Sequence, residues 1–186
     1  MADQTQNSGL VLEASLQSFF YDQLQKVNQK FSKPLPKEAI FYSSLVMDKF
    51  GDTQNYFENS DGRLRNKTLG LKLLECSEMS PAKKKRTLID IGDTALLLCG
   101  YFSESLNKKL VDEKYYKELG QIAYSRLNHL IPDVYEVPSF FKLLSKSFHD
   151  ITLMMNLVAK ESLEKVEGMN SPMLLVINDV NKIKVS

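Results

Sequence analysis

An aspartate in the most apolar stretch of the chain is the first residue whose position could support chemistry. Asp93 lies in a segment that is nearly all apolar from Leu88 to Phe102. A buried carboxylate without a partner is costly, so we expect a cation, a hydroxyl group or backbone N–H donors to contact it. Two roles fit this position: a structural carboxylate that fixes the register of two helices, or a general base or ligand anchor with a perturbed pKa. The candidate partners are Arg126, Lys109, Tyr116, Tyr124, His129 and His149.

Two glycines stand on the same predicted helix as this carboxylate. Gly92 and Gly100 each cost about 1 kcal/mol relative to alanine in a helix interior, so we expect a neighbouring helix to approach closely there. Gly120, in the next predicted helix, is the candidate to face them. The alternative is a ligand pocket in the space that the glycines leave free. The residues that would line such a pocket are Asp93, Tyr101, Tyr116 and Tyr124.

Other motifs for catalysis or cofactor binding are absent from the sequence. It contains no phosphate-binding loop, dinucleotide fingerprint, zinc-protease helix, calcium loop or nucleophile elbow. Cys76 and Cys99 lie far apart in apolar segments, and neither has metal-ligand spacing to a histidine. We therefore expect no catalytic residue, no metal and no cofactor, and we interpret both cysteines as small buried side chains in a reducing cytoplasm.

Length, composition and net charge exclude several classes of protein. The chain has 186 residues and a formal charge of +1, with 43% hydrophobic and 25% charged residues. These values are typical of a single soluble globular domain and exclude intrinsic disorder and a whole-chain polycation. No apolar run approaches the ~20 residues that cross a bilayer, and the N-terminus does not resemble a secretory signal. We expect a cytoplasmic protein without a membrane segment.

One window of the sequence is strongly basic. Between residues 61 and 86, eight basic residues stand against three acidic ones. One interpretation is a solubilising surface, and the other is a docking patch for an anion or an acidic protein, because cations and free N–H groups at a helix start act together. Nucleic-acid binding is a weaker alternative, since no basic recognition helix is evident. The candidate docking residues are Arg63, Arg65, Lys83, Lys84, Lys85 and Arg86.

Apolar residues recur at helical spacing through most of the chain. They predict helices over about residues 10–31, 36–50, 65–78, 81–106, 112–131 and 138–164, with a loop over 51–63. The third of these helices is expected to bury Leu69, Leu73, Leu74 and Cys76. The predicted fold class is therefore all-α, with a single bundle of about six helices over residues 1–167. Residues 168–186 contain two strand-like runs around a turn, which predict a short β-hairpin as a C-terminal tail.

The segment from residue 86 to residue 124 carries a distinctive series of short motifs. They are Ile91-Gly92-Asp93, Gly100-Tyr101-Phe102, Tyr115-Tyr116, and Gly120 with Ala123-Tyr124. This pattern resembles an uncharacterised family of small helical bacterial proteins, in which the first motif reads Leu-Gly-Asp, so that Ile91 departs from it. The resemblance is strong over residues 86–124, looser through the preceding helices, and does not extend to residues 168–186. It implies a helical bacterial protein and carries no activity, cofactor or substrate.

The leading hypothesis from the sequence is a non-enzymatic helical interaction or regulatory module. The lack of catalytic motifs, the basic window, the strand-like tail and the aromatic residues Tyr56 and Phe57 in the predicted loop all favour it. Such a module would act through an unidentified protein partner, and a homodimer is a second form that the interaction could take. The alternative is a small-molecule-binding or enzymatic bundle with a pocket near Asp93.

Overall fold

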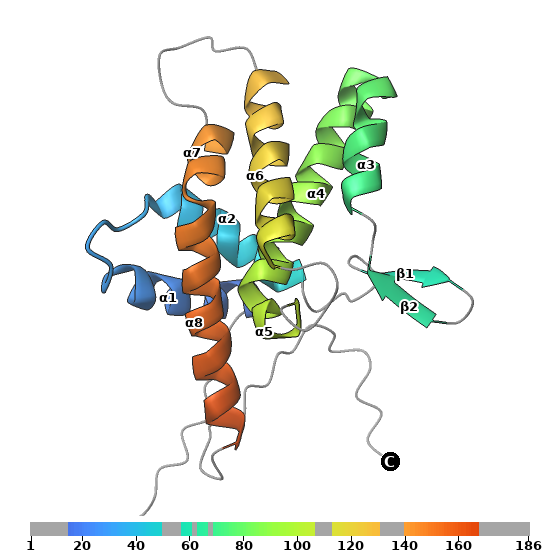
Figure 1. Cartoon of the computed structure of the whole chain (residues 1–186). Helices are drawn as coiled ribbons and strands as arrows, with labels where there is room; N and C mark the ends of the chain where they lie inside the picture. Colours follow the sequence, from blue (N-terminus) through green and yellow to red (C-terminus); the bar gives the residue numbers. More distant parts are fainter. Residues whose placement is uncertain are drawn as a thin grey trace, which may run out of the picture.

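The apolar stretch around Asp93 forms the central helix of an all-α bundle (Figure 1). The computed structural model describes residues 15–49, 57–60, 63–66, 69–106, 113–130 and 140–167. Helix α4 (Pro81–Tyr101) begins after Ser80 with a proline in its first turn, as the sequence predicts. Its residues 91–100 are all buried, because α6 (Glu113–Leu130) and α8 (Phe148–Glu167) both pack along it. The all-α prediction is confirmed.

Helices α1 (Leu16–Asn28) and α2 (Lys37–Asp48) form an antiparallel pair on one side of the bundle. Ser15 caps α1, since its Oγ accepts a hydrogen bond of 3.1 Å from the backbone N–H of Ser18. The connection to α2 is held by Asn28, whose side chain accepts from the Leu35 N–H at 2.8 Å and donates to the Leu35 carbonyl at 3.0 Å. These local contacts fix where α2 begins.

A small β-hairpin stands between α2 and α3, where the sequence predicted a loop and the start of a helix. Strands β1 (Phe57–Ser60) and β2 (Arg63–Asn66) pair antiparallel, with Phe57 opposite Asn66 and Ser60 opposite Arg63. The prediction of a helix from residue 65 was therefore wrong, and α3 covers Leu69–Glu75. The sequence signal that the prediction undervalued is the Asp-Gly pair at 61–62, which is typical of a two-residue hairpin turn.

Helix α3 lies at one edge of the bundle, on the side away from α1 and α8 (Figure 1). A 3₁₀ turn, η3 (Cys76–Glu78), leads from α3 into α4. Leu69, Leu73 and Cys76 are buried as predicted, whereas Leu74 is 72% exposed, so that prediction was wrong. The physical reason is that, among the described elements, α3 packs mainly against α4 and α6, and Leu74 points away from them.

Two predicted helices are divided in the structure. The fourth ends at Tyr101, and a short helix α5 (Ser103–Leu106) follows it. The sixth consists of α7 (Phe140–Lys146) and α8, which meet at Ser147. The Phe148 ring at this junction is fully buried and lies against Gly120 of α6. The predicted C-terminal hairpin over residues 168–186 lies outside the described residues.

Candidate functional site

Asp93 is buried in the centre of the bundle, with 4% of its surface exposed, and its two carboxylate oxygens are both used. Oδ1 accepts hydrogen bonds from the Tyr42 hydroxyl at 2.6 Å and from the Tyr124 hydroxyl at 3.0 Å. Oδ2 is ion-paired with the Lys49 ammonium group at 2.7 Å. Of the partners proposed from the sequence, Tyr124 is confirmed. The contacts are those of a carboxylate that ties α2, α4 and α6 together.

The sequence analysis missed two partners, Tyr42 on α2 and Lys49, the C-cap residue that directly follows this helix. Tyr42 and Lys49 are seven residues apart, which places them two turns apart on one face of that helix. The sequence therefore showed that these two side chains share a face. It contained no local signal that this face meets Asp93, which lies 51 residues after Tyr42 and 44 residues after Lys49. Lys49 is 48% exposed, so its side chain reaches inward from the surface to the buried carboxylate.

Burial and the neighbouring carboxylate change the acidity of both tyrosines. Desolvation is the largest cause, and it raises the pKa of Tyr42 and of Tyr124 well above the ordinary tyrosine value. The Asp93 charge raises both further, because a second negative charge beside it would be repelled. Both hydroxyls therefore remain protonated at neutral pH and act as hydrogen-bond donors. Neither is suited to act as a base.

Side chains from other helices fill the space beside the two glycines of α4. A Cβ atom at Gly92 would lie 2.5 Å from a ring carbon of Tyr124, and one at Gly100 would lie 2.7 Å from the Met155 Cβ. The sequence suggested that Gly120 faces these two glycines, and the structure shows that it does not. It lies against the Phe148 ring, and a Cβ atom there would be 3.0 Å from the Ala95 Cβ. Each glycine thus admits a large side chain of a neighbouring helix.

The remaining tyrosines of the predicted Asp93 pocket lie elsewhere in the bundle. Tyr101 is eight residues after Asp93 on α4, about 12 Å along the helix axis, and its ring packs edge-on against Phe20 at 6.2 Å. Burial raises the pKa of its hydroxyl above the ordinary value. Tyr116 is buried near the start of α6, with its ring 5.5 Å from that of Tyr115. The structure brings together Asp93 and Tyr124, and it leaves Tyr101 and Tyr116 apart from them.

The predicted docking residues are divided between β2 and the start of α4. Arg63 and Arg65 belong to β2, while the run from Lys83 to Arg86 occupies the first two turns of α4. Lys83, Lys85 and Arg86 are exposed, and Lys84 is half-buried. None of these four side chains is ion-paired with a carboxylate among the described residues. The start of α4 is therefore a basic surface whose charge the described carboxylates do not neutralise.

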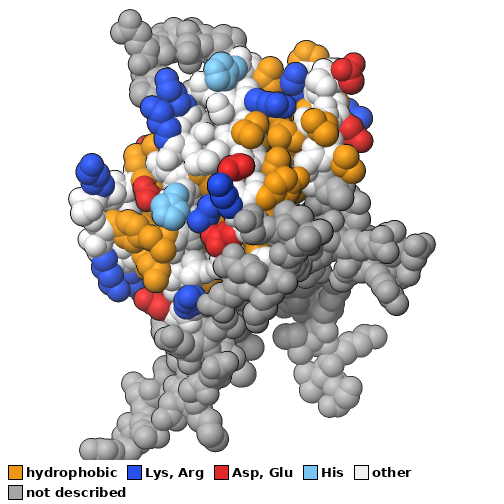
Figure 2. All heavy atoms as spheres, viewed as in Figure 1, with side chains coloured by type: hydrophobic (Ala, Val, Ile, Leu, Met, Phe, Trp, Pro, Cys, Tyr) orange, Lys and Arg blue, Asp and Glu red, His pale blue; other side chains and the backbone are white. Residues whose placement is uncertain are grey.

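An apolar surface adjoins this basic run, and we call it the α3–α6 surface. It consists of the exposed apolar side chains of Leu71 and Leu74 of α3 and of Tyr115 and Ile122 of α6, together with the exposed Arg126 of α6. Leu71 and Leu74 are 58% and 72% exposed. The Tyr115 hydroxyl lies against Gly70, and Arg126 donates to the Leu73 carbonyl at 3.4 Å, so the two helices run side by side. Figure 2 shows hydrophobic side chains gathered over α6 and α3, with Lys and Arg side chains among them.

A polar pocket of about 200 Å³ lies between α4, α6 and α8. Lys117 forms an ion pair of 2.7 Å with Glu113, and its ammonium nitrogen is 3.4 Å from Nδ1 of His149. Burial raises the pKa of the Cys99 thiol in this pocket to about 12, so the thiolate needed for nucleophilic attack is not formed at neutral pH. The polar groups here mainly join one helix to the next.

The described residues include no group of His, Cys, Asp or Glu side chains that could hold a metal ion. In the same part of the chain, no helix combines the length and apolarity that crossing a membrane requires. The arrangement offers a buried structural carboxylate, a basic helix start and an exposed apolar surface. Comparisons with protein-family models, with curated proteins and with solved structures give no match for this chain, so its resemblance to a bacterial family stays a prediction.

Proposed function

We propose that this protein is a non-enzymatic interaction module whose α3–α6 surface binds an acidic amphipathic helix of a protein partner. The observation that supports the proposal is the exposure of Leu71 and Leu74 on α3 together with the basic start of α4, where Lys83 to Arg86 form no ion pair with a carboxylate of the described residues. Exposed apolar patches rimmed by charge are typical of interaction sites.

The apolar part of the surface suits a helix. Leu71 and Leu74 are three residues apart and therefore share one face of α3, while Tyr115 and Ile122 are seven apart and share one face of α6. A partner helix lying along these two faces would cover both pairs with residues spaced at i, i+3, i+4 and i+7. Covering a leucine side chain contributes about 1.5–3 kcal/mol before the entropy of association is subtracted.

The charges at the end of α3 favour an acidic partner. Arg126 donates to the Leu73 carbonyl at 3.4 Å, near the C-terminal end of this helix, and Lys84 lies in the first turn of α4, which follows η3. Residues 69–86 hold five basic side chains, of which Lys72 is paired with Asp90, and the acidic ones there are Glu75 and Glu78. Acidic side chains flanking the apolar face of a partner would meet this excess, whereas basic ones would be repelled.

A pair of synthetic peptides tests the proposal. One is a fluorescein-labelled amphipathic helix with leucines at i, i+3, i+4 and i+7 and glutamates on its other faces, and the second has lysine in place of every glutamate. We expect fluorescence anisotropy to show binding of the acidic peptide, which weakens as salt rises. Leu74→Asp should weaken this binding about tenfold or more, because an exposed anchor becomes a charge that repels the glutamates.

Leu157→Asp is the matched control, since Leu157 is a partly exposed leucine of α8 on another face of the bundle. It should bind the acidic peptide like the unchanged protein. Equal binding of both peptides, or equal loss in the Leu74 and Leu157 variants, would contradict the proposal. So would a dimer in light scattering that Leu74→Asp dissociates, because a second copy would then be the occupant of the surface.

A further inference from the structure

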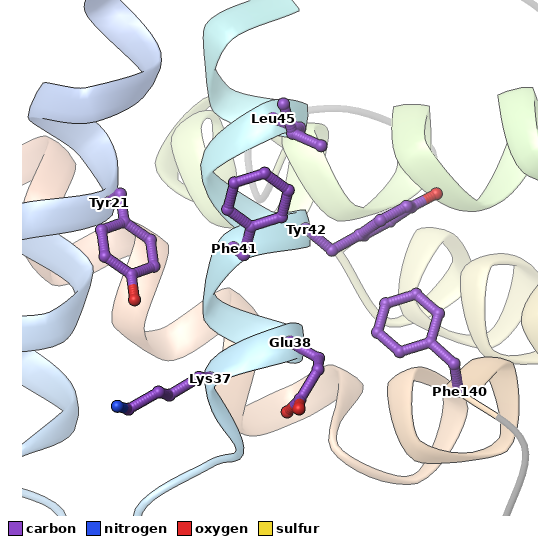
Figure 3. A pocket seen from close by; sticks show the side chains of 7 residues that line it. All are labelled: Tyr21, Lys37, Glu38, Phe41, Tyr42, Leu45 and Phe140. Atoms are coloured by element: carbon purple, nitrogen blue, oxygen red, sulfur yellow. The ribbon is translucent and has the colours of Figure 1, made fainter.

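An open pocket of about 390 Å³ lies between α1, α2 and α7, away from the α3–α6 surface (Figure 3). Aromatic rings line most of it: Tyr21 comes from α1, Phe41 and Tyr42 from α2, and Phe140 from α7. The Tyr21 and Phe41 rings meet edge to face at 6.3 Å, and those of Tyr42 and Phe140 do so at 5.2 Å. Leu45, Lys37 and Glu38 complete the lining.

The buried Asp93 holds one wall of this pocket in place. The ring of Tyr42 lines the pocket, while its hydroxyl points away from Phe41 and donates to Asp93 at 2.6 Å (Figure 3). Because Asp93 is itself fixed by Tyr124 and Lys49, the Tyr42 side chain cannot swing about its Cα–Cβ bond without breaking its hydrogen bond to Asp93. The Tyr42–Phe140 pair is therefore organised before any ligand arrives, which lowers the entropy lost on binding.

The opposite wall is exposed and apolar. Phe41 is 50% exposed, and Leu45 follows one turn later on the same face of α2. Two charged side chains stand at the N-terminal end of this face. Lys37 extends towards α1, whereas Glu38 lies between Lys37 and Phe140 (Figure 3). The Glu38 carboxylate forms no ion pair with any other described residue.

We infer that this pocket binds a quaternary ammonium group, with the aromatic rings around its methyl groups and Glu38 as its counter-charge. The faces of aromatic rings attract cations, and a quaternary ammonium ion has no N–H groups that would need hydrogen-bond acceptors. A neutral apolar ligand would gain less here, because an open pocket leaves much of its surface in water. An anion would face the negative faces of the rings and the carboxylate.

Choline and its neutral isostere 3,3-dimethylbutan-1-ol provide the test, because they differ in charge and hardly in shape. We expect the methyl proton signal of choline to shift upfield when it binds, since the protons would lie over ring faces. Choline should bind about tenfold more tightly than the isostere, the ratio that corresponds to about 1.4 kcal/mol of cation–π and ionic attraction. Equal binding of the two compounds would overturn the inference.

Two neighbouring substitutions give opposite results for a cation and for an anion. Glu38→Gln should weaken choline binding about threefold to tenfold, whereas Lys37→Gln should leave it unchanged or strengthen it, because a like charge is removed. Weakening by Lys37→Gln without weakening by Glu38→Gln would show an anion site and contradict the inference. Phe41→Leu keeps an apolar residue at a half-exposed position, so it should fold normally and still weaken binding through loss of the ring.

The same chemistry could come from a small molecule or from a protein side chain. A short peptide that carries trimethyllysine, compared with the same peptide carrying unmodified lysine, separates these sources. Stronger binding of choline than of the trimethylated peptide assigns a small-molecule ligand, and the reverse assigns a modified side chain. Either result supports the pocket as a quaternary ammonium site. Absence of binding by both probes to the folded protein would overturn it. This test involves none of the residues of the α3–α6 surface.

Discussion

The ring of Tyr124 lies directly against Gly92, and its hydroxyl donates to Asp93, the next residue on α4. A side chain at position 92 would push the ring away, and with it the hydroxyl that the buried carboxylate requires. Gly92 lets α6 approach α4 closely, and this close approach brings the Tyr124 hydroxyl to the buried Asp93 carboxylate. This relationship explains why both residue types stand side by side in an apolar helix.

Gly92→Ala is expected to destabilise the protein by about 1–3 kcal/mol, although alanine favours helices by about 1 kcal/mol over glycine. The added Cβ would lie 2.5 Å from a carbon of a fully buried ring, which has no room to move. Urea unfolding would measure the change. Gly70→Ala is the control, since the one close neighbour of Gly70 among the described residues is the hydroxyl end of the half-exposed Tyr115, and it should change the free energy of unfolding much less.

Asp93→Asn is expected to lower the free energy of unfolding by about 2–4 kcal/mol, because a buried ion pair loses one charge and the new amide N–H faces an ammonium group. Lys49→Met alone should cost about 1 kcal/mol, since Lys49 is half exposed and solvent screens its charge. The double variant should lose less stability than the two single losses added together, because the new amide N–H no longer faces an ammonium group.

Lys72→Met is the matched control for this ion pair. Lys72 pairs with Asp90 at 3.3 Å, and the Asp90 side chain is 41% exposed whereas that of Asp93 is 5% exposed, so Lys72→Met leaves a better solvated carboxylate and should cost less stability than Lys49→Met. Additive losses at positions 49 and 93, or an equal effect of Lys72→Met and Lys49→Met, would show that Asp93 does not depend on its lysine.

Stability should fall steeply as the pH rises above about 10, where tyrosines of the unfolded chain lose their protons. The pKa values of Tyr42 and Tyr124 are raised in the folded state, so the folded protein keeps these protons and alkali favours unfolding. Each tyrosine contributes a slope of about 1.4 kcal/mol per pH unit in this range. Below pH 10 both states are protonated, and the contribution is constant.

Tyr42→Phe should make the fall in the free energy of unfolding above pH 10 less steep by the contribution of one tyrosine, about 1.4 kcal/mol per pH unit. Urea unfolding at several pH values between 9 and 11 would measure it, with Tyr115→Phe as the control for removal of a half-exposed tyrosine. A slope that is unchanged in Tyr42→Phe would contradict the burial of this hydroxyl against Asp93.

Both cysteines should resist thiol reagents in the folded protein. Burial raises the pKa of Cys99 to about 12 and also raises that of Cys76, so that few thiolates exist at pH 8. The Ellman reaction should be at least about 100-fold slower for Cys99 in the native protein than in urea. Cys76→Ser isolates the signal of Cys99. Rapid modification of Cys99 without denaturant would show that the pocket around it opens readily.

Local sequence signals were sufficient for much of the helical framework. Ser80-Pro81 set the start of α4, and the unbroken apolar run beyond it predicted the central buried helix. The need of Asp93 for a buried partner, and Tyr124 as one candidate, followed from the cost of an isolated charge. These features were predictable because caps, periodicity and desolvation act over a few residues.

The partner set of Asp93 and the exposed face of α3 were decided only by the tertiary structure. Lys49 and Tyr42 reach Asp93 because α2 packs beside α4, and no local pattern encodes which of several tyrosines and cations will arrive there. Leu74 is exposed because no helix of the described part of the chain covers the outer side of α3, although its spacing is that of a core residue. Periodicity states which residues share a face, and packing between distant segments determines whether that face is buried.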